Sequence, residues 1–217
     1  MSGRLPVELW DERADAYRTS ASHAAGPDLD RLVSWAEGET ALDVATGGGH
    51  VARRLRERGF RVVTADPAPG MGADTTCFAE DLPFADRSFD TAVTRIAAHH
   101  FADVGRAVSE LARVASRVVL VEDTLYTDER VEAAEKLRDP THVRSYTERE
   151  WRGFFAAAGL EVEEVALVRK RHELEGWLVR TACTGEDAAR VRELLAHVTE
   201  GGHWTDTKIL LRGRASR

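Results

Sequence analysis

The run of three glycines from Gly47 to Gly49 constrains the fold more than any other part of the chain. It lies in the stretch TALDVATGGGHVARRL, between an apolar segment and an Arg-rich helical pattern. An apolar strand that ends in a glycine turn and opens a helix is typical of a ligand cradle, because glycine lets the backbone approach a ligand closely and the helix N-terminus offers unpaired N–H groups. In open parallel sheets such a ligand lies beyond the carboxyl ends of the strands.

Short apolar runs alternate with helical patterns through the whole sequence. The predicted strands are Ala41–Ala45, Arg61–Ala65, Thr75–Ala79, Phe89–Thr94, Val118–Glu122, Glu161–Val168 and Lys208–Arg212. The predicted helices are Val7–Arg18, Leu29–Glu37, His50–Arg58, Val104–Ala115, Asp128–Arg138, Glu148–Ala158 and Glu186–His197. This alternation predicts an α/β fold with a doubly wound, Rossmann-like and mainly parallel sheet of seven strands. We expect the C-terminal strand to run antiparallel, either between two neighbours or at the edge of the sheet.

One crossover in this pattern is too short. Only eight residues separate Asp66 from Thr75, and they include two prolines and two glycines. A parallel crossover normally takes a dozen or more residues with a helix, so the crossover helix after strand two is predicted to be short or missing. The N-terminal helices or a second copy of the chain would then cover that part of the sheet, which makes a homodimer one candidate assembly.

The length of 217 residues fits one domain with its own core. We expect residues 1–217 to form a single domain, in which residues 1–38 make an N-terminal helical lid. Residues 39–217 then make the Rossmann-like core, together with C-terminal elements on the substrate side.

Composition excludes several classes of function. The formal net charge of -7 disfavours nucleic-acid binding, which usually needs a basic surface. The basic run at residues 169–172 (RKRH) is interpreted as a solvated strand end. Cys77 and Cys183 lack metal-ligand spacing and indicate a reducing compartment. The N-terminus carries charges throughout, and no apolar run reaches the length of a membrane span. We therefore expect a cytoplasmic protein.

Two acidic residues accompany the glycines. Asp66 ends the second strand, 19 residues after Gly47, where a carboxylate can accept hydrogen bonds from both ribose hydroxyls. Asp43 lies inside the first strand, where its negative charge favours a cationic ligand over a pyrophosphate. Two alternatives stay open: Gly47, Gly49 and Ala52 satisfy the G-x-G-x-x-A pattern of dinucleotide sites, and a glycine turn can occur without any ligand.

Five separated segments, in order, carry a resemblance to a known family. They are AYRTSASHAAGPDLDRLV, ALDVATGGGH, DLPFADRSFDTAV, RIAAHHF and RDPTHVRSYTEREW. Together they resemble the class I S-adenosylmethionine-dependent methyltransferases, especially the C-methyltransferases of ubiquinone and menaquinone biosynthesis. The resemblance covers about Asp15 to Leu160. It implies methyl transfer from S-adenosylmethionine to carbon or oxygen of a small molecule, in quinone-like or specialised-metabolite biosynthesis.

The resemblance also implies roles for individual residues. The implied cofactor-binding residues are Tyr17, His23, Asp43, Ala45, Thr46, Gly47, Gly49, Asp66, Pro67, Met71, Glu80, Asp81, Leu82 and Arg95. Within this set Asp43 faces the methionine end of the cofactor, Asp66 binds the ribose, and Tyr17 and His23 belong to the lid. The sequence departs from the family at Phe78, where members usually carry an Asp for the adenine amino group.

Histidines supply the candidate bases, because imidazole titrates near neutrality. His99 and His100 follow the fourth strand at the edge where substrates bind. We predict His100, and after it His142, as the catalytic base. The predicted substrate contacts are His99, Asp123, Arg144 and Tyr146. Capping or packing is the alternative role for each of these residues. A metal site is not expected, because His23, His100 and His142 come from separate loops without fixed spacing.

Two other functions remain open. The chain could bind the cofactor structurally and catalyse a reaction without methyl transfer, such as a cyclisation. The G-x-G-x-x-A match keeps a nicotinamide-dependent reductase as a further alternative.

Overall fold

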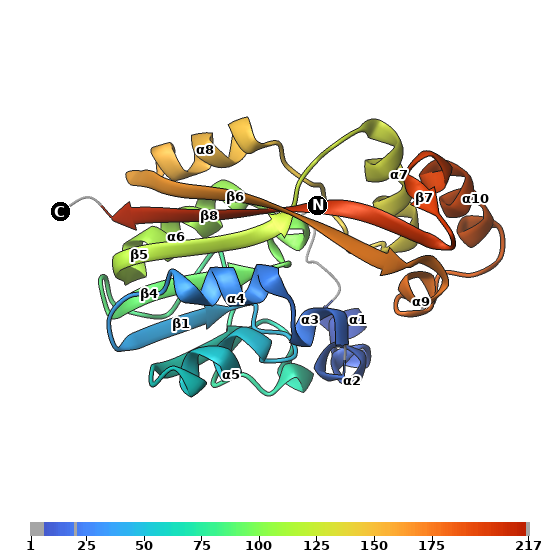
Figure 1. The fold of residues 1–217 in the computed structure, drawn as a ribbon. Coiled ribbons are helices and arrows are strands. Elements are labelled where there is room, and N and C mark those ends of the chain that lie inside the picture. The colour runs from blue at the N-terminus through green and yellow to red at the C-terminus, as the bar shows by residue number, and fades with distance from the viewer. Residues whose placement is uncertain (1–6, 20, 216–217) are drawn as a thin grey trace.

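A sheet with seven strands along its main path organises the chain (Figure 1). The computed structural model describes residues 7–19 and 21–215. The strands are β1 (Thr40–Val44), β2 (Arg61–Asp66), β3 (Thr75–Thr76), β4 (Phe89–Arg95), β5 (Ala115–Thr124), β6 (Leu160–Glu173), β7 (Thr199–Glu200) and β8 (His203–Ala215). Their order is β3-β2-β1-β4-β5-β8-β6, and the two-residue strand β7 pairs with β8 alone. Strands β1 to β5 are parallel, whereas β8 runs antiparallel between β5 and β6. The predicted fold class is confirmed, and the last strand is inserted rather than at the edge.

Helices cover both faces of the sheet. The α-helices are α1 (Val7–Glu12), α2 (Ala14–Arg18), α3 (Ala21–Ala24), α4 (Pro27–Ser34), α5 (His50–Glu57), α6 (Val104–Val114), α7 (Glu129–Arg138), α8 (Glu148–Ala157), α9 (Leu174–Val179) and α10 (Gly185–Leu195), and the 3-10 turns are η1 (Pro69–Met71), η2 (Ala98–His100) and η3 (Ala196–Val198). Strand β5 shows the two faces: Val119 and Val121 pack in the core with α6 and α8, while Val118 and Leu120 pack with α4 and α5. Successive strand side chains point to opposite faces, so a strand buried on both faces is apolar throughout.

The crossover after β2 is reduced to η1, as its length predicts. The N-terminal helices pack against this turn. The Asp11 carboxylate accepts a hydrogen bond of 2.7 Å from the Gly70 N–H, and the Arg18 guanidinium donates one of 2.7 Å to the Gly70 carbonyl. The single helix predicted over Val7–Arg18 is divided at Arg13 into α1 and α2, and α3 was not predicted. Residues 1–6 of the predicted lid lie outside the described residues.

Strands β6 and β8 are longer than predicted and run past the sheet as a two-stranded ribbon. Beyond the sheet, the ribbon carries α9 and α10, which gather with α7 around a separate apolar core (Figure 1). Trp177 of α9 and Trp204 of β8 meet edge to face in this core, with ring centroids 4.5 Å apart. The charged run at residues 169–173 hid the continuation of β6, because strand prediction relies on apolar residues. None of the described helices has the length and apolar character needed to cross a membrane.

Candidate functional site

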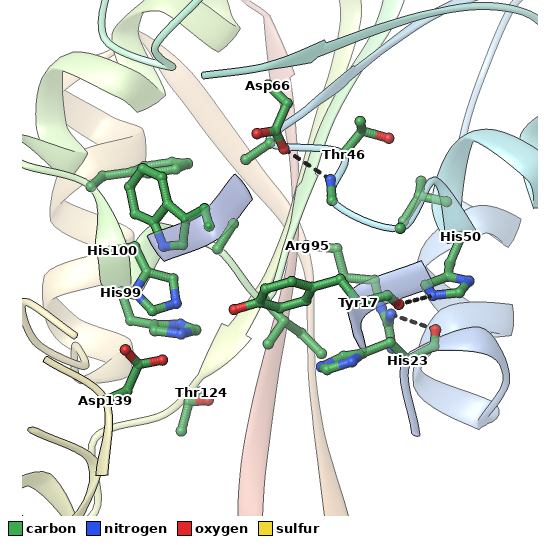
Figure 2. Close-up of a pocket in the computed structure, with 18 of the residues that line it drawn as sticks. Tyr17, His23, Thr46, His50, Asp66, Arg95, His99, His100, Thr124 and Asp139 are labelled. Atoms are coloured by element: carbon green, nitrogen blue, oxygen red, sulfur yellow. Dashed lines mark hydrogen bonds between the residues drawn. The ribbon is translucent and has the colours of Figure 1, made fainter. Parts of the chain in front are cut away.

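A cavity opens at the carboxyl ends of β1, β2 and β4 (Figure 2). The glycine loop, which we define as residues 45–49, forms one side of it. Helices α1 to α3 cover it, and α7 and α9 close the far side together with the β6–β8 ribbon. This is the edge of a parallel sheet at which ligands bind in open α/β folds.

Backbone conformation explains the glycine loop. Gly47 has φ +51°, and Gly49, the N-cap of α5, has φ +72°; both angles lie in the left-handed region that glycine tolerates. A Cβ added to Gly47 would meet no protein atom within 4 Å, so the space beside this loop is open to a ligand. Gly48 is constrained differently, since a Cβ there would lie 2.6 Å from the Tyr17 carbonyl oxygen. Ala45 adopts φ +55° without being glycine, which concentrates strain at the loop.

Asp43 is buried beneath this loop and lines the cavity. Its Oδ2 accepts hydrogen bonds from the Thr46 hydroxyl at 2.7 Å and from the Ala52 N–H at 3.0 Å. Burial raises the pKa of Asp43 to about 6 despite these bonds. A neighbouring positive charge would restore the ionised form, so the site favours a cationic ligand.

Asp66 lies on the same side of the cavity, at the end of the adjacent strand β2. Its Oδ2 accepts from the Gly47 N–H at 2.9 Å, and its Oδ1 accepts from the Ala68 N–H at 3.0 Å. These bonds fix the carboxylate at the rim of the cavity, and burial raises its pKa. Each carboxylate oxygen can accept a further hydrogen bond, which is what a ribose diol requires. The pair Asp43 and Asp66 with the open glycine loop therefore fits a nucleoside that carries a positive charge.

The cavity gathers most of the other predicted cofactor residues. Those that line it are Tyr17, His23, Ala45, Thr46, Gly47, Pro67, Met71, Glu80 and Arg95. The Tyr17 ring extends across the middle of the cavity, and the Tyr17 carbonyl lies 3.0 Å from Nε2 of His50 (Figure 2). Phe78, at the position of the family Asp, lines the cavity with 37% of its surface exposed. Adenine would therefore meet an apolar surface there.

Three predicted cofactor residues lie outside the cavity lining: Gly49, Asp81 and Leu82. Gly49 acts through the N-cap conformation of α5. Leu82 is buried, and its N–H donates to Glu110 at 2.9 Å. Asp81 is exposed on the loop before β4.

Arg95 lines the cavity and also forms ion pairs that hold neighbouring elements together. Its Nε donates to Glu122 at 2.8 Å and its Nη2 to Asp28 at 2.7 Å, so it joins β4, β5 and α4. Lys170 adds a second cation to Asp28 at 2.6 Å. Asp28 and Glu122 are fully buried, and such carboxylates persist only when they are paired.

His99 and Asp123 form a dyad on the side of the cavity opposite the glycine loop. Nδ1 of His99 lies 2.5 Å from Oδ1 of Asp123, and the His99 backbone N–H donates to Oδ2 at 2.7 Å. Because the carboxylate only accepts, Nδ1 carries the proton. Asp123 raises the pKa of His99 against the opposing effect of burial, although burial is the larger single influence on the ring. Asp123 itself is buried behind the ring.

His100 has different surroundings. Its Nδ1 lies 3.0 Å from both the carbonyl oxygen and the hydroxyl of Thr141. A carbonyl can only accept, so Nδ1 is the protonated nitrogen and Nε2 keeps its lone pair. Burial and the neighbouring His99 lower the pKa of His100 to about 3. His100 therefore stays neutral near pH 7, whereas His99 can take up a proton.

The segment that follows α7 contributes less than predicted to the lining of the cavity. His142 is buried behind His99, with its Nε2 3.3 Å from Glu132. Arg144 pairs with Glu150 at 2.7 Å near the surface, and Tyr146 packs in the core beneath α8. None of His142, Arg144 and Tyr146 lines the described cavity, and no metal-binding group of three or more side chains occurs among the described residues.

Sequence reasoning missed the far wall of the cavity. This wall comes from α7, the α9 end, β6 and β8, and its polar residues are Glu135, Arg138, Asp139, Lys170, His172, Arg180, Asp206 and Lys208. The interpretation of residues 169–172 as a solvated strand end is wrong for two of them. Arg169 and Arg171 are exposed, but Lys170 and His172 point inward. Strand alternation is the signal that could have found them.

Comparison with known proteins identifies the family of the chain. Residues 17–165 match the methyltransferase domain family. The chain is 31% identical over 214 residues to the uncharacterized methyltransferase YcgJ of Bacillus subtilis, covering 87% of this chain and 83% of that protein. The YcgJ crystal structure superposes with a TM-score of 0.78, at 24% identity, over 87% of this chain and 98% of that one. A methyltransferase structure from Bacillus halodurans gives 0.77 at 28% identity, over 88% and 100%.

A more distant relative is named for its substrate. The demethylmenaquinone methyltransferase of Clavibacter sepedonicus is 32% identical over 137 residues, which cover 52% of this chain and 56% of that protein. The aligned part is therefore about half of each chain.

Proposed function

This chain belongs to the class I S-adenosylmethionine-dependent methyltransferases, and we propose that it methylates carbon or oxygen of a small molecule held between the glycine loop and the histidines. The observation that carries the proposal is one cavity lined by Asp43 and Asp66 on one side and by His99 and His100 on the other. We place the acceptor in specialised or quinone-like metabolism, on the strength of the demethylmenaquinone relative.

The residues at hand fit the cofactor. Asp43 would hold the ammonium group of its methionine end, and Asp66 would accept from the two ribose hydroxyls. Pro67, Met71 and Phe78 would hold the adenine by apolar contact. When bound, S-adenosylmethionine supplies an electrophilic methyl group on a sulfonium. The protein must then align the acceptor, exclude water and remove a proton.

His99 is the base that these surroundings favour. Its Nδ1–H bond to Asp123 leaves Nε2 to accept the proton that the acceptor loses as its oxygen or carbon bonds to the methyl group. Asp123 stabilises the imidazolium that results, as the carboxylate does in a His–Asp pair of a hydrolase triad. His100, with its low pKa, instead accepts a hydrogen bond from the acceptor and orients it. His142 would act behind these rings, through packing.

Calorimetric titration with S-adenosylhomocysteine tests the proposal. We expect stoichiometric binding to the native protein, binding weakened at least 10-fold in Asp66→Asn, and no binding of reduced nicotinamide dinucleotides. Transfer of a labelled methyl group from S-adenosylmethionine to a screened acceptor would establish the reaction. Absence of S-adenosylhomocysteine binding would refute the proposal, and unweakened binding by the variant would refute the role of Asp66.

A further inference from the structure

The cations that line the cavity are paired with carboxylates, with one exception among the described residues. The pairs are Arg95 with Asp28 and Glu122, Arg138 with Glu135, Lys170 with Asp28, and Lys208 with Asp206. Their N···O distances run from 2.6 to 3.1 Å. A charge in a largely buried cavity loses part of its hydration, and pairing with a carboxylate offsets that cost.

Arg180 is the exception. It follows α9, is partly buried, and lines the cavity. Within residues 7–19 and 21–215, its guanidinium makes no ion pair and no hydrogen bond; only its backbone N–H is bonded, to Gly176. Burial, and after it the positive charge of Arg138, lowers the pKa of Arg180. The arginine is thus held in the cavity without a counter-charge.

The groups of opposite sign that face Arg180 do not neutralise it. Glu135 is engaged by Arg138 at 3.1 Å. The phenol of Tyr17 contributes no charge near pH 7, because burial raises its pKa further above 10. An unpaired guanidinium costs stability in the unliganded protein. A guanidinium group can donate two parallel hydrogen bonds to a carboxylate or a phosphate.

We infer that Arg180 binds an anionic group, a carboxylate or a phosphate, on the methyl acceptor. The inference rests on the proposed function and names the substrate class that it leaves open. Arg180 projects from the α7–α9 side, whereas the cofactor residues Asp43 and Asp66 lie at the tips of β1 and β2. Trp177, also on that wall, adds apolar surface beside the charge. The acceptor is therefore an acid with an apolar body.

Inorganic phosphate serves as the probe, titrated by calorimetry into protein saturated with S-adenosylhomocysteine. Saturation fills the site of the cofactor carboxylate, so a remaining anion site belongs to the acceptor. We expect phosphate to bind the native protein, Arg180→Met to weaken that binding at least 10-fold, and Arg149→Met to change it less than 2-fold. Arg149 is exposed on α8 and provides a matched loss of one charge. Arg180→Met should unfold at a temperature no lower than the native protein, since it loses no ion pair.

Equal phosphate affinity in Arg180→Met and the native protein would overturn the inference, as would absence of phosphate binding to the saturated protein. A third result would also overturn it: Arg180→Met weakening S-adenosylhomocysteine 10-fold but leaving 5′-methylthioadenosine unchanged, because the arginine would then hold the cofactor carboxylate. If the native protein binds no S-adenosylhomocysteine, the proposed function fails by itself. Phosphate titration of the unliganded variants then still decides the role of Arg180.

Discussion

The two sides of the cavity are built by different means. On the glycine-loop side, Asp43 and Asp66 are held by backbone N–H groups and a hydroxyl that lie within 19 residues along the chain. On the far wall, Lys170 reaches Asp28 across 142 positions, and Arg13 reaches Asp139 across 126. The glycine-loop side therefore depends on contacts that are local in the chain, whereas the far wall forms only when the whole chain has folded. We expect the glycine-loop side to tolerate substitutions in other parts of the chain, and the far wall to depend on its ion pairs.

The largest effect is expected at the dyad of His99 and Asp123, which lies opposite the glycine loop. Asp123→Asn removes the charge that raises the pKa of His99, so the imidazolium loses its partner. We expect kcat/KM to fall roughly 10²- to 10⁴-fold. In the native protein, activity should rise with pH through a midpoint above 6.5, since the raised pKa keeps His99 protonated below it.

Nuclear magnetic resonance titration of the His99 ring provides a measurement that needs no acceptor. The pKa of His99 should be above 6.5 in the native protein and lower in Asp123→Asn. An identical His99 pKa in both proteins would refute the coupling of His99 to Asp123. His142→Gln serves as a control for the neighbouring ring and should leave kcat/KM within about 5-fold of the native value, because His142 does not line the cavity.

The free energy of unfolding distinguishes inward-facing from outward-facing residues of β6 in the far wall. Lys170→Met leaves Asp28 with Arg95 as its remaining partner, and we expect a loss of about 1–3 kcal/mol in the free energy of unfolding. Arg171→Met, one position along the same strand, changes an exposed side chain and should stay within about 0.5 kcal/mol. Urea denaturation measures both. Equal losses would contradict the division into inward and outward residues.

On the glycine-loop side, the pH dependence of binding tests Asp43. Its pKa of about 6 in the unliganded protein lies above the usual 3.8, so the carboxylate is mostly protonated at pH 5 and mostly ionised at pH 7. A cationic ligand lowers that pKa. Affinity for S-adenosylhomocysteine should therefore rise with pH from 5 to 7 and then level off, with proton uptake by buffer seen calorimetrically. Asp43→Asn should bind about 10-fold more weakly at pH 7 and lose most of this pH dependence.

The smallest effect is expected at Gly48. An added Cβ would lie 2.6 Å from the Tyr17 carbonyl oxygen and 2.7 Å from Nε2 of His50, so Gly48→Ala must displace α2. The loop itself would keep its conformation. We expect about a 3- to 10-fold loss of S-adenosylhomocysteine affinity, on the order of 1 kcal/mol, with faster proteolysis of the N-terminal helices. Gly153→Ala, where a Cβ has open space, is the control; an equal effect of the two changes would refute the contact.

The fold, and the position of the glycine loop at the cavity, can be predicted from the sequence because both depend on local signals. Strand periodicity, the capping box of Thr147 and Glu150, and the short crossover after Asp66 are each readable within about ten residues. The far wall cannot be predicted in this way. Arg180 and Lys170 lie in no recognisable motif, and their place in the cavity depends on residues that are distant in the chain. The sequence favours His100 over His99 as the base, because the bond between His99 and Asp123 depends on the register of β4 with β5, which the sequence does not reveal.

The ribbon of β6 and β8 continues the strands of the sheet without interruption. Inward and outward positions therefore keep one phase from the core to the cavity wall: Leu210 faces the buried core, and Lys208 and Asp206 face the cavity two and four residues earlier. Substitutions at these inward positions of β8 can reshape the far wall of the cavity while the glycine-loop side stays unchanged. An insertion or deletion of one residue cannot, because it would turn Lys208 and Asp206 to the opposite face of β8 and bring their neighbours along the strand into the cavity. Among relatives, this arm should diversify by exchange of side chains and not by change of length.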